Sequence, residues 1–374
     1  MRRSDRGAVD PFIVMDVMER ARAAEAAGAS VIHMEVGQPG TPAPAAARRA
    51  VAEALEAGPL GYTVALGLPA LRARIARLYA DWYGVDLDPG RVIVTSGSSV
   101  GFVLAFTALF DARARVGLGL PGYPSYRQIL RALSLDPVGI ETAAPDYRID
   151  PARIGPDLAG LIVASPNNPT GAMLDRAALE ATVAACAAAD VALVSDEIYH
   201  GLHHDARAVS ALEVTDDVVV INSFSKYFSM TGWRVGWMVV PEELVAPVQR
   251  LAQNLYISAP ELSQVAAREA LSETEELEAV RETYAANRTI LVEALPRLGF
   301  ADLFPADGAF YVYACCEELA DDSMDLAERL LELGVAATPG QDFDARDGHR
   351  WMRFSYAGSR ATLKTAVERM ARLR

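Results

Sequence analysis

Residues 161–194 read LIVASPNNPTGAMLDRAALEATVAACAAADVALV, in which two short apolar runs flank an Ala-rich helical stretch. The same alternation extends over residues 91–240. Near-continuous apolar strands separated by helices are typical of a mostly parallel sheet that is covered on both faces. The sequence therefore predicts an α/β fold with three layers. The expected strands are Arg91–Thr95, Arg115–Leu120, Leu161–Ala164, Val191–Val194, Val218–Ile221 and Val235–Val240.

The pattern changes after the last of these strands. We expect a long amphipathic helix over residues 242–292, followed by isolated strands such as Ala309–Tyr313 and Trp351–Ser355 mixed with helices. Such segments predict a smaller α+β domain, which the N-terminal segment joins. The expected division is a large domain of residues 40–285 and a small domain of residues 1–39 plus 286–374.

Composition excludes several classes of protein. The 374 residues are 51% hydrophobic and 22% charged, which is typical of a folded globular protein and not of a disordered or collagen-like chain. A net charge of −14 disfavours nucleic acid or an anionic membrane as a partner. The three cysteines form no CxxC pair, and no apolar run reaches the roughly 18 residues of a membrane helix. Because the N-terminus also lacks a signal-peptide pattern, we expect a cytoplasmic protein.

Polar and reactive residues follow the expected strands at the point where each strand ends. Ligands of open parallel sheets bind beyond these carboxyl ends. The residues are Ser98 and Ser99 after RVIVT, Tyr123 after RVGLGL, Asn168 after LIVA, Asp196 and Tyr199 after VALV, and Lys226 after VVVI. Together they favour one ligand that has an anionic group, a flat ring and a centre reactive toward an amine.

Residues 223–236, SFSKYFSMTGWRVG, resemble the lysine signature of the class I/II aminotransferases, which are fold-type I pyridoxal-phosphate (PLP) enzymes. The resemblance covers nearly the whole chain, from Gly37 to the region of Arg353. It implies PLP as the cofactor, and an amino acid and a 2-oxo acid as substrates. The chain departs from the family pattern at Arg113-Ala114, where Gly-Asp is usual, and at Asp344, where Gly usually follows the phenylalanine.

The resemblance implies a role for each residue near the reacting atoms. Lys226 would form the internal aldimine with PLP and carry a proton between the substrate α-carbon and the cofactor, which requires a depressed lysine pKa. Asp196 would keep the pyridine nitrogen protonated, and Asn168 and Tyr199 would donate to the phenolic oxygen. A lone lysine after a strand is usually solvated, and a lone aspartate there usually caps a helix. The signature around Lys226 favours the catalytic interpretation.

The resemblance also implies where the anionic groups of cofactor and substrate bind. The phosphate is expected at the N-terminus of the helix that follows Gly97. Its expected ligands are Ser98, Ser99, Ser223, Ser225 and Arg234, and Tyr123 is expected on the ring face. Arg353 in WMRFS matches the arginine that clamps the substrate carboxylate, beside Gly37. Tyr62 matches the position that reaches the phosphate of the neighbouring subunit, which implies a homodimer.

The same lysine and carboxylate clamp also serve PLP-dependent C–S β-lyases, and this reaction is the main alternative. Transamination is favoured by the complete carboxylate site and by the MTGWR segment. No second arginine can be assigned to grip a side-chain carboxylate, so we expect neutral or aromatic amino donors.

Other motifs point to weaker alternatives. Gly97–Gly101 satisfies GxSxG, so a serine hydrolase with Ser99 as nucleophile is a remote alternative, with His349 as the one late histidine. Gly117–Gly122 satisfies GxGxxG, but its glycines lie within an expected strand and not after it.

Two further functions are less compatible with the sequence. His200, His203 and His204 lie in a segment that is more typical of a solvated loop than of a metal site, so no metal is expected. A PLP-binding transcriptional regulator would need an added DNA-binding domain, whereas the family resemblance begins by residue 37 of an acidic chain.

Overall fold

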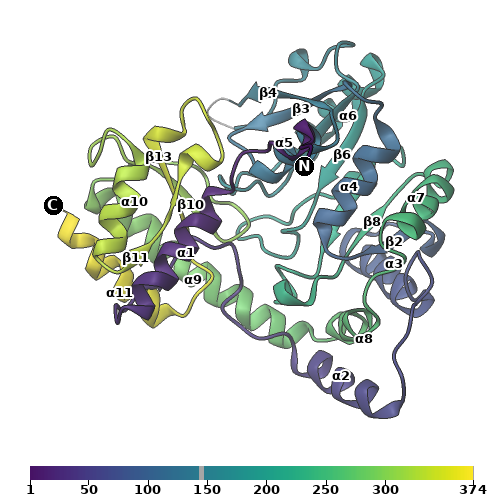
Figure 1. The fold of residues 1–374 in the computed structure, drawn as a ribbon, viewed down its shortest axis with the longest axis horizontal. Coiled ribbons are helices and arrows are strands. Elements are labelled where there is room, and N and C mark those ends of the chain that lie inside the picture. The colour runs from purple at the N-terminus through teal and green to yellow at the C-terminus, as the bar shows by residue number, and fades with distance from the viewer. Residues whose placement is uncertain (143–146, 374) are drawn as a thin grey trace.

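The computed structural model describes residues 1–142 and 147–373, and it confirms the predicted α/β fold. Figure 1 shows a larger lobe beside a smaller one. The larger lobe is built on a seven-stranded sheet of order β2-β8-β7-β6-β5-β3-β4, in which β8 runs antiparallel to β2 and β7 and the other pairs are parallel. Its strands are β2 (Val92–Thr95), β3 (Arg115–Leu120), β4 (Asp136–Glu141), β5 (Gly160–Ala164), β6 (Ala192–Asp196), β7 (Val219–Ser223) and β8 (Gly236–Val239).

Helices cover both faces of this sheet. Successive strand residues point to opposite sides, so Ile162 faces one hydrophobic core while its neighbours Leu161 and Val163 face another. The first core includes α4 (Ser98–Leu109), α5 (Pro124–Ala132) and α7 (Glu242–Leu255), and the second includes α3 (Pro69–Tyr83) and α6 (Arg176–Ala189). Burial on both faces explains why the strand sequences are apolar at nearly every position.

The smaller lobe joins the N-terminal segment to the C-terminal residues. β1 (Ile32–His33) pairs in parallel with β11 (Val335–Ala336), and Figure 1 shows α1 (Ile13–Ala26) against the C-terminal elements. An antiparallel sheet of order β12-β13-β10-β9 completes this lobe. Its remaining elements are β9 (Ala301–Leu303), β10 (Tyr311–Cys315), β12 (Thr338–Pro339), β13 (Trp351–Ser355), α10 (Ser323–Glu332) and α11 (Arg360–Met370).

The single long helix expected over residues 242–292 is wrong. Three helices occupy this region: α7 (Glu242–Leu255), α8 (Glu261–Ala270) and α9 (Thr274–Leu298). α7 ends at Leu255, and Pro260, which disfavours helical geometry in the residue before it, lies at the N-cap of α8 and so separates the two helices. α8 then turns to pack on α2 (Ala45–Ala57). The expected domain boundary at residue 285 falls inside α9, and the division into domains stays a prediction.

The structure also shows local differences from the expected elements. Strand β4 was not expected, because its sequence DPVGIE has no continuous apolar run; it lies at the edge of the sheet. β10 begins two residues later than expected, after Ala309 with its left-handed φ of 60°. Arg113 also has a positive φ, 70°, a conformation that favours the glycine usual there in the family. Short 3₁₀ helices lie at Asp5–Gly7, Pro89–Arg91, Pro151–Arg153, Ala211–Glu213, Thr231–Trp233, Gly340–Asp342, Gly348–Arg350 and Ala371–Leu373.

Candidate active site

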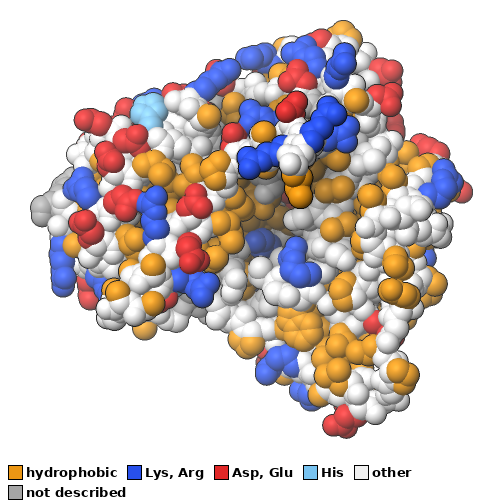
Figure 2. Space-filling view, viewed as in Figure 1, with side chains coloured by type: hydrophobic (Ala, Val, Ile, Leu, Met, Phe, Trp, Pro, Cys, Tyr) orange, Lys and Arg blue, Asp and Glu red, His pale blue; other side chains and the backbone are white. Residues whose placement is uncertain are grey.

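Lys226, one of the predicted residues from the strand ends, lies where the two lobes contact each other. Figure 2 shows a hollow between the lobes with basic side chains at its rim. The Lys226 Nζ donates a hydrogen bond to the carbonyl oxygen of Gly37 at 2.5 Å. Lys226 follows a strand of the larger lobe, whereas Gly37 follows β1 in the smaller one. The lysine thus contacts both halves of the molecule.

The environment of Lys226 favours a neutral amine. Burial lowers the pKa of Lys226 to about 7, and the positive charges of Arg353 and Arg234 add to this effect. The Nζ lies 5.6 Å from the ring centre of Tyr199 and 5.8 Å from that of Phe310. A lysine in this state can act as a nucleophile and as a base near neutral pH.

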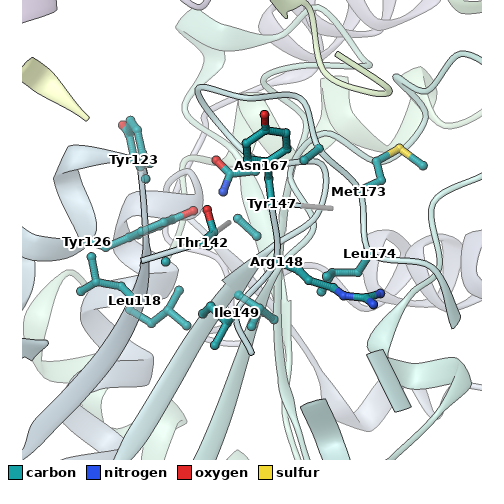
Figure 3. A pocket seen from close by; sticks show the side chains of 16 residues that line it. Leu118, Tyr123, Tyr126, Thr142, Tyr147, Arg148, Ile149, Asn167, Met173 and Leu174 are labelled. Carbon is teal, nitrogen blue, oxygen red and sulfur yellow. The ribbon is translucent and has the colours of Figure 1, made fainter. Parts of the chain in front are cut away.

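Asp196 is buried at the end of β6 with two hydrogen-bond donors. The hydroxyl of Tyr126 donates to its Oδ2, and the backbone N–H of Ile198 donates to its Oδ1 at 3.0 Å. Burial raises the pKa of Asp196 to about 6. Figure 3 shows Tyr123 and Tyr126 together beside the neighbouring pocket, and their rings meet edge to face at 5.3 Å. Sequence reasoning missed Tyr126, although its position one helical turn after Tyr123 is a usable signal.

Arg353 is a buried cation on β13, with 3% of its surface exposed. Its Nη1 donates to the Oδ1 of Asn168 at 2.8 Å, and its Nη2 donates to the carbonyl oxygen of Glu35 and to the Oγ1 of Thr338. Its Nε has no hydrogen-bond partner among the residues that the structure describes. In residues 1–142 and 147–373, no carboxylate forms an ion pair with Arg353. A buried charge without a counter-ion favours binding of an anion at this point.

A second candidate anion site lies at the N-terminus of α4. Gly97 precedes the helix and offers no side-chain cap, and a Cβ there would lie 2.3 Å from the Nη2 of Arg234. Within the described ranges no carboxylate pairs with Arg234; its Nη1 donates to the carbonyl oxygen of Thr231 at 3.0 Å. Ser223 donates to the Ser225 hydroxyl at 2.9 Å in the adjoining loop. Uncapped N–H groups, a guanidinium and hydroxyls together fit a phosphate group.

The remaining predicted site residues differ in how far they are buried. Tyr199 is buried, with its hydroxyl oxygen 2.9 Å from that of Tyr311. Ser98 is partly buried in the first turn of α4, while Ser99 is exposed and lines a separate cleft with Phe12. No hydrogen bond joins Ser99 to a histidine in the described parts of the chain. The Tyr62 side chain is 84% exposed in the loop before α3, so it does not reach the site of its own chain.

The expectation of a solvated histidine segment is wrong. His200 is only 2% exposed, with its Nδ1 2.6 Å from the Tyr83 hydroxyl and its Nε2 2.9 Å from the carbonyl oxygen of Ser165. Burial lowers the pKa of His200 to about 3. His203 and His204 are partly buried. The turn after Tyr199 is therefore buried at His200, against Tyr83 and Ser165. The polar composition of GLHHD did not indicate this burial. The described residues contain no cluster of three or more His, Cys, Asp or Glu that could hold a metal ion.

Comparison with known proteins decides the family. The family model of aminotransferase class I and II matches residues 29–370. This chain belongs to that family. The aminotransferase is 43% identical to the valine–pyruvate aminotransferase of Mycobacterium tuberculosis, over 98% of this chain and 96% of that protein. It is also similar to the crystal structure of an aminotransferase from Mycobacterium tuberculosis, with a TM-score of 0.97, 42% identity, and coverage of 100% of this chain and 98% of that one.

More distant relatives support the same assignment. The structure of aspartate aminotransferase from Thermus thermophilus with maleate is 33% identical, with a TM-score of 0.94 and full coverage of both chains. This aminotransferase is therefore a PLP-dependent enzyme that transfers an amino group between an amino acid and a 2-oxo acid, and the lyase alternative is not favoured. None of the helices in the described ranges combines the length and the hydropathy needed to cross a bilayer.

Proposed function

We propose that this aminotransferase binds PLP among Lys226, Asp196 and Arg234, binds the substrate carboxylate at Arg353, and uses amino acids with uncharged side chains. The observation that carries the proposal is a pair of arginines, Arg353 and Arg234, that have no carboxylate partner in the described ranges and whose charges both act on a lysine with a pKa of about 7. One arginine fits the cofactor phosphate and the other fits the substrate carboxylate. The acid needed at the ring nitrogen is available in buried Asp196.

Each side chain then has a defined task. PLP, when bound, supplies an aldehyde that reacts with amines and a ring that withdraws electrons from the substrate α-carbon. Asp196, whose pKa is about 6, accepts a hydrogen bond from a protonated ring nitrogen. The Lys226 Nζ, about half neutral at pH 7, takes the α-proton and later returns it. Asn168 orients the Arg353 guanidinium through its Oδ1. The buried setting keeps water from competing with these contacts.

The apolar surroundings of Arg353 support donors with uncharged side chains. The guanidinium carbon lies 4.3 Å from the ring centre of Tyr311 and 4.7 Å from that of Phe343. Arg353 is the only arginine or lysine among the buried residues of the described chain. A second carboxylate on the substrate would therefore lose its hydration without gaining a buried cation. The valine–pyruvate aminotransferase supports valine as donor and pyruvate as acceptor for the first assays.

A half-reaction screen tests the substrate class. Purified holoenzyme is mixed with single amino acids, and conversion of its absorption band to that of the pyridoxamine form is followed. Valine and alanine should convert the enzyme at least tenfold faster than aspartate at equal concentration, because burying a second carboxylate is costly. Faster conversion by aspartate would overturn the substrate assignment. Production of pyruvate, ammonia and sulfide from cysteine, without conversion to the pyridoxamine form, would instead indicate elimination.

Borohydride reduction tests the position of the cofactor. Reduction of the holoenzyme followed by peptide mapping should place a pyridoxyl group on Lys226. A label on Lys364, the other lysine of the chain, would contradict the assignment. The Lys226→Ala variant serves as the control, and it should retain no reducible label.

We also propose a cytoplasmic homodimer with a shared active site. Exposed apolar side chains on α2, on the following loop and after α7 support such an interface, and Figure 2 shows hydrophobic side chains around α2 and α8. These side chains are Leu55, Leu60, Tyr62, Val64, Leu255 and Ile257. The loop lies against α8, since Gln264 donates a hydrogen bond to Thr63 at 2.9 Å. A partner that covers this face would bring Tyr62 to the neighbouring site.

A further inference from the structure

Tyr311 contacts three parts of the proposed site whose proximity the sequence did not predict. It begins β10 and is 1% exposed. Its hydroxyl oxygen lies 2.9 Å from that of Tyr199, and its ring centre lies 4.3 Å from the guanidinium carbon of Arg353. A Cβ at Gly37 would come within 1.9 Å of the Tyr311 hydroxyl oxygen. One side chain therefore contacts the tyrosine expected at the cofactor, the arginine expected at the substrate, and the segment that accepts the lysine hydrogen bond.

We propose that Tyr311 is a positioning residue with two separable parts: its hydroxyl polarises Tyr199, and its ring holds the guanidinium of Arg353 for the substrate carboxylate. The proposal rests on the roles proposed above for Tyr199 and Arg353. It adds to them a residue that itself needs to touch neither cofactor nor substrate.

The hydroxyl part follows from the number of donors available. Burial raises the pKa of both Tyr199 and Tyr311, so both phenols keep their protons. Each hydroxyl has one hydrogen to donate. If Tyr199 gives its hydrogen to the phenolic oxygen of PLP, Tyr311 must supply the hydrogen of the bond between the two tyrosines. Accepting that bond makes Tyr199 a stronger donor, because hydrogen bonds in a chain polarise one another.

The ring part follows from the surroundings of Arg353. Hydrogen bonds to Asn168 and Thr338 engage its two terminal nitrogens, and no carboxylate in the described parts of the chain neutralises its charge. The ring faces of Tyr311 and Phe343 supply favourable contacts for an unpaired guanidinium. Loss of one ring would leave Arg353 free to rotate about its long side chain, which would weaken carboxylate binding.

A spectroscopic titration tests the hydroxyl part. The absorbance of the holoenzyme is recorded against pH for wild type, Tyr311→Phe and Tyr199→Phe. The wild-type hydroxyl chain stabilises negative charge on the cofactor oxygen, so Tyr311→Phe should shift the titration upward by about half a pH unit. Tyr199→Phe should shift it further in the same direction. Tyr313→Phe is the matched control, because Tyr313 lies on the same strand, is also 1% exposed, and has a hydroxyl without a hydrogen-bond partner in the described ranges.

Steady-state kinetics test the ring part. Tyr311→Leu should raise KM for the best amino donor about tenfold, whereas Tyr311→Phe, which keeps the ring, should change it less than twofold. Equal PLP content and equal melting temperature in the absence of substrate establish that Tyr311→Leu folds. If it does not fold, the isosteric Tyr311→Phe titration still tests the proposal.

Steric rescue gives an independent measurement of the contact with Gly37. Gly37→Ala should weaken binding of pyruvate, the proposed 2-oxo acid substrate, by more than tenfold, because its Cβ overlaps the Tyr311 hydroxyl. The double variant with Tyr311→Phe should recover part of this loss, since the nearest remaining ring atom is the Cζ at 3.0 Å. Absence of recovery would show that the contact between residue 37 and the Tyr311 hydroxyl is not what weakens binding in Gly37→Ala.

The outcomes separate the proposal from the function on which it rests. An unchanged titration in Tyr311→Phe, with a shift in Tyr199→Phe, overturns the role of Tyr311 and leaves the proposed function intact. Unchanged titrations in both variants remove the assigned role of Tyr199 and, with it, that of Tyr311. Equal KM values for Tyr311→Leu and wild type overturn the ring part, while a raised KM in Arg353→Lys would still support the carboxylate site.

Discussion

At the scale of single residues, the proposed site depends on charges that have no counter-ion among the described residues. Arg353 is the clearest case, because it is 3% exposed and its Nε has no hydrogen-bond partner in that part of the chain. Burying a guanidinium without a counter-ion is unfavourable unless a bound anion pairs with its charge. The positive charge of Arg353 also lowers the pKa of Lys226, so the two residues are coupled electrostatically.

Replacement of Arg353 tests this arrangement. Arg353→Lys keeps the charge but loses the planar pair of donors, so kcat/KM for the best donor should fall by about 100-fold, mainly through KM. Steady-state kinetics with valine and pyruvate give this measurement. Arg350→Lys is the control, since Arg350 pairs with Glu317 near the surface and should tolerate the change. Unchanged kinetics in Arg353→Lys would show that the substrate carboxylate does not bind at Arg353.

At the scale of elements, helix α4 provides a candidate phosphate site because its first turn has no side-chain cap. Gly97 has a φ of 79°, and an added Cβ would lie 2.3 Å from Arg234. Gly97→Ala should therefore weaken PLP binding at least tenfold, by backbone strain and by displacement of the guanidinium. Equilibrium dialysis of the apoenzyme measures this affinity. Gly232→Ala, where a Cβ meets no atom within 4 Å, should bind PLP as the wild type does.

The strand β1 carries a titratable pair that affects stability. Partial burial opposes protonation of His33, but hydrogen bonds to Glu35 and Glu25 outweigh it and raise the pKa of His33 above 6.5. The protonated form is therefore favoured in the folded state. Its contribution to stability is complete below pH 6.5 and is lost as the pH rises through the raised pKa.

Unfolding of a His33 variant tests the direction of this dependence of stability on pH. His33→Gln should lower the free energy of unfolding by about 1 kcal/mol more at pH 5.5 than at pH 8.5, a value reduced by the exposure of the ring. Urea titrations at the two pH values give the difference. In a Glu35→Gln background, where the main partner is uncharged, the extra loss at pH 5.5 should be smaller. A larger loss at pH 8.5 would contradict the assignment.

At the scale of the whole molecule, the site requires both lobes and, in our proposal, a second subunit. Mixing Lys226→Ala subunits with Tyr62→Phe subunits should restore part of the activity, because a heterodimer would contain one site with both native residues. Activity after verified subunit exchange is the measurement. No recovery from two clearly defective parents would exclude a shared site. Homodimers of each parent, exchanged with themselves, serve as controls.

The order of elements was predictable because it depends on local patterns. Apolar runs of strand length between Ala-rich stretches indicated the parallel sheet, and the polar residues directly after these runs predict where a ligand would bind. The lysine signature singles out Lys226, and the segments around Asp196 and Asn168 single out the groups proposed to act with it. One sequence is enough for these predictions, because a residue directly after a parallel strand lies at the carboxyl edge of the sheet in any arrangement of the other elements.

Contacts between distant segments were decided only by tertiary structure. Tyr126 on Asp196, Tyr311 on Tyr199 and Glu35 on Arg353 join residues that are 70, 112 and 318 positions apart. No local pattern encodes such a pair, because its geometry depends on how elements far apart in the sequence pack, within one lobe for the first and third pairs and between the lobes for Tyr311 and Tyr199. The same reason explains the three helices found where one was expected, since α8 changes direction to reach α2. The chemistry of each residue could be predicted from its local sequence, whereas its hydrogen-bond partners are brought to it only by the packing of distant segments.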